Sequence, residues 1–220
     1  MKKATLITFI CTFTLLEATA QELPQKSKEL TIGLGAALYN GDLGKGYQPG
    51  SLMGSIGLKL NADKKLHGNL HVIFGSVTGQ ELDYEFAGDP EAEPNTYFSS
   101  SFFGVHYELA FNLIAQEGFK LYLSQGIGFF RFQPKDEFGN KLLDQPNSRD
   151  LNEDYRNISF MLPTQLGGRY TLENGYSLGL QIGFLNPLSD YVDNISTWGG
   201  KSGNDNILTL RVNTYIPIHF

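Results

Sequence analysis

Eight segments of the chain alternate between large apolar residues and small or polar residues. In residues 176–184, YSLGLQIGF, Tyr176, Leu178 and Phe184 share one face, and Ser177 and Gln181 share the other. Alternation at a period of two residues is typical of a β-strand with one apolar face. The other segments are residues 30–38, 52–60, 67–75, 102–111, 119–129, 158–169 and 208–220. The pattern predicts an all-β chain with eight strands.

The composition of the two faces indicates which of them is turned toward lipid. In a soluble barrel, large apolar side chains fill the interior and the outer face is rich in Lys, Glu and Asp. Here the apolar face carries almost no charge, and the opposite face has too many glycines for a solvated surface. A charged side chain facing lipid costs about 2–4 kcal/mol at the bilayer midplane. We therefore predict that the apolar face contacts lipid and that the small and polar face packs inside.

The links between the segments alternate in length. They are short after the second, fourth and sixth segments and long after the first, third, fifth and seventh. This alternation predicts an eight-stranded antiparallel transmembrane β-barrel with short periplasmic turns and long extracellular loops. Pro163 and Pro217 lack the N–H group that a closed sheet needs, so we expect a bulge at Pro163 and a frayed periplasmic end at Pro217.

The N-terminus has the features of a secretory signal peptide. Lys2 and Lys3 precede an apolar stretch too short to span a bilayer, and small residues lead up to Ala20. We predict cleavage near Ala20, a short lead at 21–28 and an outer-membrane barrel at 29–220. No later apolar run is long enough for a spanning helix, so any span must consist of strands. The terminal Phe220 resembles the C-terminal signal of outer-membrane barrels.

Composition excludes several kinds of function. Removal of the predicted signal peptide leaves 15 basic and 22 acidic side chains, a net charge of −7, which argues against a nucleic-acid partner. It also removes Cys11, the single cysteine, and with it thiol nucleophiles and thiolate metal sites. The glycine-rich stretches GLGAAL and GIGFFR lack the third glycine of a dinucleotide-binding fingerprint. We expect no cofactor.

Two groups of residues could bind metal ions, but both are better explained as structural. The acidic loop ELDYEFAGDPEAEPN lacks the ligands of an EF-hand at Ala87 and Pro94. His67, His71 and His106 fall on inward faces of neighbouring segments, where histidines that form hydrogen bonds are commoner than metal ligands. The long loops contain no histidine to serve a hydrolase at the rim. We expect no metal site and no catalytic residue.

The interior of an eight-stranded barrel is just wide enough for side chains to fill it. Glu108 is the one clear interior acid of the sequence, and Lys59, Lys120, Arg169 and Arg211 are expected to compete for it. The predicted polar network of the lumen consists of Lys59, His71, His106, Glu108, Lys120, Arg169 and Arg211. We expect this network to belong to a plugged lumen.

Closure of the barrel brings two loop stretches together. YNGDLG, residues 39–44, follows the first segment, and NPLSDYVDNIS, residues 186–196, follows the seventh. Because the last strand of a closed barrel pairs with the first, both loops should leave the same rim side by side. Asp42, Asp190 and Asp193 are expected to accept hydrogen bonds from backbone N–H groups in Asx-type turns rather than to bind a ligand.

These two stretches resemble small outer-membrane β-barrel proteins, a family that includes a component of the type IX secretion and gliding machinery. The resemblance departs at Asn194, where a second acidic residue is expected. It implies an outer-membrane anchor that contacts periplasmic lipoproteins of a secretion complex. The residues that carry it form a rim motif with a structural or partner-contact role: Tyr39, Gly41, Asp42, Leu43, Asp190, Tyr191, Asp193 and Ser196.

The sequence as a whole predicts a non-enzymatic structural or anchoring protein of the outer membrane, in contact with membrane lipid, with type IX secretion as the machinery that the resemblance implies. The alternative is a small pore or a ligand-binding transport barrel, which the inward Phe102, Tyr122 and Tyr215 oppose. A soluble lipocalin-like carrier is a third possibility, and in it the two faces would be reversed.

Overall fold

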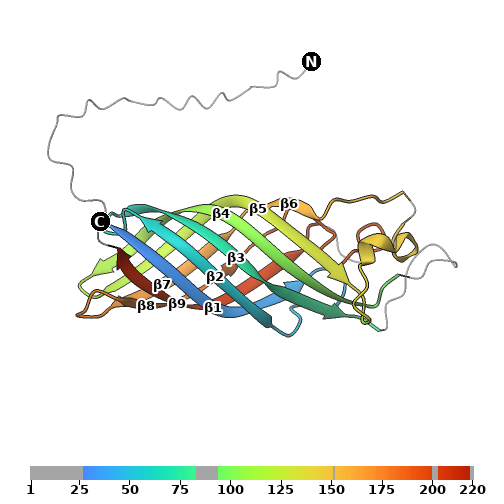
Figure 1. The fold of residues 1–220 in the computed structure, drawn as a ribbon, viewed down its shortest axis with the longest axis horizontal. Coiled ribbons are helices and arrows are strands. Elements are labelled where there is room, and N and C mark those ends of the chain that lie inside the picture. Colours follow the sequence, from blue (N-terminus) through green and yellow to red (C-terminus); the bar gives the residue numbers. More distant parts are fainter. Residues whose placement is uncertain (1–26, 83–93, 151, 200–202, 219–220) are drawn as a thin grey trace, which may run out of the picture.

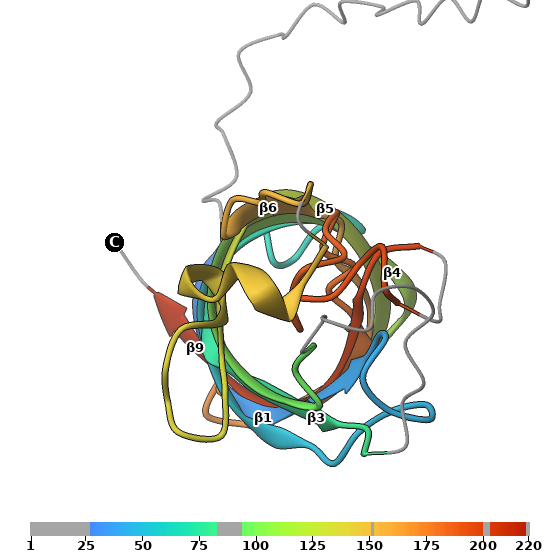
Figure 2. The ribbon, with the colours of Figure 1, turned by 90° about the vertical axis from the view of Figure 1, so that its right-hand side faces the viewer.

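The protein forms a closed antiparallel β-barrel, seen from the side in Figure 1 and along its axis in Figure 2. The computed structural model describes residues 27–82, 94–150, 152–199 and 203–218. The strands are β1 (Lys28–Asn40), β2 (Ser51–Leu60), β3 (Leu66–Gln80), β4 (Tyr97–Gln116), β5 (Phe119–Lys135), β6 (Ile158–Met161), β7 (Thr164–Thr171), β8 (Ser177–Phe184) and β9 (Asn206–Ile218). Two short 3-10 turns, η1 (Leu142–Asp144) and η2 (Pro146–Ser148), lie between β5 and β6.

The prediction of eight strands is confirmed. Nine strands are labelled, but β6 and β7 are two parts of one barrel strand, and both pair with β5. The predicted bulge at Pro163 is wrong. Gly128 pairs with Met161 and Gln125 with Thr164, so two residues separate these pairs on each strand and none is inserted. Instead, the ladder is interrupted. The Gln125 side-chain amide donates to Gly126 O at 3.4 Å, where the missing proline N–H would have donated.

The links alternate as predicted, with short turns at one end of the barrel and long loops at the other (Figure 1). β1 begins and β9 ends at the short-turn end, where Lys28 pairs with Ile218. The predicted frayed end at Pro217 is wrong on one side, because Pro217 still pairs with Glu29 of β1. On the other side, pairing with β8 ends at Tyr215.

The predicted assignment of the two faces is confirmed over the short-turn half of the barrel. Leu34 and Leu178 point outward, with 60% and 52% of their surface exposed. His106 and Glu108 point inward and are buried. Leu, Ile, Val and Phe side chains of every barrel strand form a continuous outer band, as expected for a surface that lipid covers.

Toward the loop end the polarity of the two faces is reversed, which the sequence reading missed. β3, β4 and β5 continue beyond the predicted segments, and there Ser101 and Arg131 point outward whereas Phe98, Phe130 and Phe132 are buried inside. An outer face that meets water must be polar, so the apolar side chains turn inward and form an ordinary hydrophobic core. The prediction of a small and polar interior is therefore wrong for this half of the lumen.

The predicted signal peptide and most of the lead at 21–28 lie outside the described residues, as do Phe220 and most of the acidic loop. Within the described residues, no helix has the length and apolarity that crossing a membrane would require.

Candidate functional site

The two loop stretches of the rim motif meet inside the mouth of the barrel. The Tyr39 hydroxyl, on the inner face of β1, lies 2.5 Å from Asp193 Oδ2 and 2.7 Å from Asp205 Oδ1. Asp193 Oδ2 also accepts a hydrogen bond from the Leu43 N–H, at 3.2 Å, and Oδ1 accepts one from the Ile195 N–H, at 2.9 Å. The hydrogen bond from the Ile195 N–H forms an Asx-type turn. The hydrogen bond from the Leu43 N–H joins the loop between β8 and β9 to the loop between β1 and β2.

The Tyr39 hydroxyl contacts two carboxyl groups, and two hydrogen bonds between these three groups require two protons. A phenol and two ionised carboxylates carry only one. Asp205 Oδ2 accepts from the Val192 N–H at 2.8 Å, and Oδ1 faces the Tyr39 hydroxyl. The single phenol proton satisfies one carboxyl group, so the other must donate to the phenol oxygen. Because both oxygens of Asp193 already accept backbone N–H groups, the extra proton belongs on Asp205. Burial raises the pKa of Asp205 well above its usual range and raises that of Asp193 to about 7.

Two glycines let the backbone approach these carboxyl groups. A β-carbon on Gly41 would lie 1.9 Å from both the Tyr39 hydroxyl and Asp205 Oδ1, so any other residue would displace the hydrogen-bonded group. A β-carbon on Gly199 would lie 2.2 Å from Asp42 Oδ2, so the loop backbone covers that carboxyl group. Asp42 is buried.

Asn194 joins three of the long loops through its side chain. Its amide nitrogen donates to Asn95 Oδ1 at 3.0 Å and to Ser148 Oγ at 2.8 Å. Its oxygen accepts from the Tyr155 hydroxyl at 2.9 Å and from Arg149 Nη1 at 3.4 Å. The residue has φ 79°, which asparagine tolerates better than most residues. An aspartate here would lose both donated bonds, so the side-chain amide is required at this position.

The remaining rim residues lie at the outer edge of the same mouth. The Ser196 hydroxyl donates to Asp190 Oδ2 at 2.9 Å, and burial raises the pKa of Asp190 to about 6. The Tyr191 ring stacks on Tyr155 with ring centres 4.5 Å apart and an interplanar angle of 4°. The structure thus brings all eight rim-motif residues to one end of the barrel.

Apolar side chains close the mouth beneath these polar contacts. Side chains of the last loop pack on the aromatic side chains of β4 and β5, and loop segments cross the opening in Figure 2. The core includes Tyr39, Leu43, Met53, Ile73, Val77, Phe98, Phe102, Phe130, Phe132, Leu142, Met161, Leu185, Val192, Ile195 and Ile207. Between this core and the short-turn end lies the polar part of the lumen.

The lumen network is connected differently from the prediction. Glu108 accepts hydrogen bonds from His106 Nε2 at 2.9 Å and from Ser124 Oγ at 2.7 Å. His71 stacks on the His106 ring, with ring centres 5.2 Å apart. The four cations predicted to compete for Glu108 form no hydrogen bond or ion pair with it within the described part of the chain, because a histidine and a serine already occupy both oxygens.

The cations have other partners. Arg169 pairs with Glu29. The sequence analysis missed this interior acid, although Glu29 lies on the same face of β1 as Thr31 and Gly33. Lys120 donates to the carbonyl oxygen of Ala62 at 3.1 Å. Lys59 Nζ lies 3.4 Å from His67 Nε2 and 4.8 Å from the ring centres of both Tyr122 and Tyr215, a cation–π arrangement.

Within the described ranges, no group of three or more His, Cys, Asp or Glu side chains is placed to hold a metal ion. His67 is turned to Lys59, whereas His71 and His106 stack on each other.

Several residues of the mouth were missed from the sequence. Asp205 directly precedes β9, and the pairing of Asn206 with Asn40 puts it beside Gly41, so strand register could have revealed it. Asn95, Ser148, Arg149 and Tyr155 belong to long loops whose paths no strand pattern specifies.

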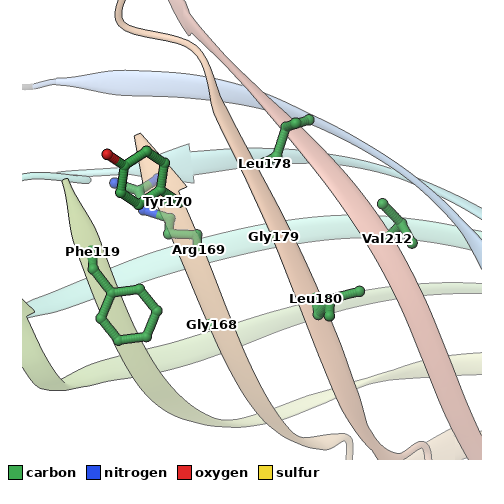
Figure 3. A pocket seen from close by; sticks show the side chains of 8 residues that line it. All are labelled: Phe119, Gly168, Arg169, Tyr170, Leu178, Gly179, Leu180 and Val212. Atoms are coloured by element: carbon green, nitrogen blue, oxygen red, sulfur yellow. The ribbon is translucent and has the colours of Figure 1, made fainter. Parts of the chain in front are cut away.

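A depression of about 350 Å³ lies on the outer face at the short-turn end (Figure 3). Phe119, Tyr170, Leu178, Leu180 and Val212 surround Gly168, which places no side chain between them. Apart from Arg169, whose guanidinium group pairs with Glu29, the lining lacks a charged group that could orient a substrate.

Comparisons with known proteins identify the fold. No protein-family model matches, and no curated protein matches. Among solved structures, Neisserial surface protein A matches with a TM-score of 0.53 and 10% identity, over 88% of this chain and 99% of that chain. The chain has the fold of small outer-membrane β-barrels. Ail, the attachment invasion locus protein of Yersinia pestis, solved with the heparin analogue sucrose octasulfate, matches with a TM-score of 0.51 and 10% identity, over 89% and 100%.

The outer-membrane enzyme PagL is also similar, with a TM-score of 0.40 and 16% identity, over 86% of this chain and 99% of that chain. Because one fold serves many functions, function has to be argued from the mouth and the lumen of this chain.

Proposed function

We propose that the protein is a non-enzymatic barrel of the outer membrane that acts as a structural or anchoring component. The observation that carries the proposal is the closed mouth. Three long loops are joined through Asn194, and an apolar core fills the space beneath them. A mouth built in this way favours a fixed shape over passage of a solute.

The same observation opposes the alternative of a small pore. An aqueous path through the loop half would have to pass Phe98, Phe130 and Phe132, which are fully buried. Opening it would separate the last loop from these rings and break the contacts of Asp193 and Asn194.

Enzymatic chemistry at the rim also lacks support. His67, His71 and His106 all lie within the lumen. Both oxygens of Asp193 accept backbone N–H groups, so this carboxylate is occupied by a structural role.

An anchor would contact its partners at the periplasmic end. The turns at the short-turn end expose Lys64, Glu117 and Glu173, which are available to periplasmic lipoproteins of a secretion complex. Membership of a type IX machinery rests on the resemblance of the rim motif, and the predicted cleavage near Ala20 would deliver the chain to the envelope.

Photo-crosslinking in the native host tests the anchor. A crosslinking amino acid at Lys64, Glu117 or Glu173 should capture the same periplasmic lipoprotein, and one at the outward Leu180 should not. The tagged protein should fractionate with the outer membrane and migrate as a compact barrel on a gel without heating. Capture of no discrete partner from the three turns, or recovery in the soluble periplasm, would refute the proposal. In planar bilayers the purified protein should show no steady conductance; stable single channels would favour the pore.

A further inference from the structure

Arg211 is a buried cation without a hydrogen-bond partner. It points inward from β9 and is fully buried. Within the part of the chain that the structure describes, none of its three guanidinium nitrogens has a hydrogen-bond partner. An arginine in a protein stays protonated, so it cannot escape the cost of burial by losing its charge. An unpaired buried charge costs several kcal/mol, so Arg211 requires a counter-charge.

Neither interior carboxylate forms a hydrogen bond or ion pair with Arg211 within the described residues. The oxygens of Glu108 accept from His106 and Ser124, and Glu29 pairs with Arg169, although the charge of Arg211 does act on Glu108 through space. On the described inner face of the short-turn half, four cations, Lys59, Lys120, Arg169 and Arg211, therefore face two carboxylates.

Other polar atoms that lack partners line the same part of the lumen. Ser55 and Asn213 both pair with Gly33, from β2 and β9. A β-carbon on Gly33 would lie 2.4 Å from Ser55 Oγ and 2.2 Å from Asn213 Oδ1, so both groups converge above this glycine. Asn213 is two residues from Arg211 on the same face of β9. Ser55 Oγ has no hydrogen-bond partner within the described residues.

The apolar core of the mouth covers the part of the lumen around Arg211 on the loop side. Met53 and Ile73 of that core are fully buried and are next to Ser55 and His71 on the inner faces of β2 and β3. A small ion in this part of the lumen would thus be shielded from the solvent at the loop end, where the dielectric constant is high.

We propose that Arg211 holds a small inorganic anion in the lumen, with the Ser55 hydroxyl as a further donor. The guanidinium fork suits chloride as well as a small oxyanion such as nitrate. Water could satisfy the N–H groups, but it would leave the excess positive charge in place. The anion would therefore be an internal part of the folded barrel.

Thermal unfolding of the full-length mature barrel in detergent tests the proposal. Chloride is titrated against gluconate, which is too large to enter, at constant ionic strength, and the midpoint is read from the heat-modifiable gel shift. The wild-type midpoint should rise with the logarithm of the chloride concentration, as for a ligand that binds the folded state. R211M should show no chloride dependence and should be at least as stable as the wild type in gluconate. The matched control R156M removes an exposed arginine and should behave as the wild type does.

A crystal of the wild type grown in bromide provides a readout that needs no variant. An anomalous peak beside the Arg211 guanidinium is expected. Absence of both the peak and the chloride response would mean that water alone fills this part of the lumen, and the proposal would be wrong. A chloride response that persists in R211M would also refute it. A peak without stabilisation by chloride would identify an adventitious ion only, and this result too would overturn the proposal.

Discussion

Raising the pH should loosen the last loop, and the variant D205N should abolish this effect. The buried pair Asp193 and Asp205 holds one proton that the unfolded chain releases near pH 4. A pKa that is higher in the folded state gives stability that is fully present below about pH 4 and is lost as the pH rises through the folded pKa. Because the two carboxyl groups share this proton, the pKa of about 7 found at Asp193 belongs to the pair and not to one residue. A rise from 3.8 to about 7 corresponds to a loss of about 4 kcal/mol, or about 1.4 kcal/mol per pH unit.

D205N reproduces the protonated side chain. Its amide oxygen can accept from the Val192 N–H, and its amide nitrogen can donate to the Tyr39 hydroxyl, which then donates to Asp193. No proton is needed, so the mouth should keep its stability at high pH. D193N is the matched contrast. It places an amide donor against a backbone N–H and should destabilise the mouth at every pH by about 1–3 kcal/mol.

Hydrogen exchange of peptides from residues 185–199, corrected for the intrinsic rate, measures the opening of the loop. Wild-type protection should fall up to about tenfold per pH unit between pH 5 and pH 7. The buried Asp42 also faces the pair. Asp190, whose pKa is about 6, acts on Asp205 and adds a slope that both proteins share. The difference between wild type and D205N isolates the contribution of the pair. If D205N retains the wild-type slope, the proton does not reside on Asp205 and the reasoning fails.

Three further changes test other parts of the structure. N194D should lose the bonds to Asn95 and Ser148 and lower the protection of the same loop by about 1–3 kcal/mol, whereas N152D at an exposed position should not. E108A leaves His106 and Ser124 without their acceptor and adds to the interior charge excess, so the thermal midpoint should fall by an amount equivalent to about 3–5 kcal/mol, and E108Q should recover part of it. L34R places a charge in the outer apolar band and should cost about 2–4 kcal/mol in folding into lipid vesicles, whereas S101R, on the outward polar part of β4, should fold as the wild type does. Equal folding yields of L34R and S101R would contradict the assignment of the faces.

The strand pattern predicted the barrel because a period of two is a local property. Each strand needs its outward residues to be apolar where lipid covers them, and Leu34 and Leu178 are such residues. The pattern failed where the surroundings change along a single strand. In β4 the inward residues change from His106 and Glu108 to Phe98, and a rule with one fixed interior could not anticipate the reversal.

The mouth was predicted only as far as strand register extends. Closure of β9 on β1 brought Tyr39 and Asp193 to the same rim, as the hydrogen bond between them requires. The role of Asn194 depends on the folding of the loop between β5 and β6, which local sequence does not specify. Glu29 was missed for a simpler reason, since the first segment was begun one residue too late.

The reversed polarity at the loop end also makes insertion of the barrel into the membrane hard to reverse. The apolar core of the mouth can form only after three long loops have passed through the membrane, because those loops supply Leu43, Leu142 and Ile195 to it. Once this core and the bonds of Asn194 have formed, withdrawal of a strand from the membrane would require the mouth to unfold. It would also require the polar backbone of the loops to re-enter the hydrocarbon of the bilayer. The folded mouth would thus slow the withdrawal of the barrel from the membrane. This kinetic barrier would hold the inserted barrel in addition to its equilibrium stability.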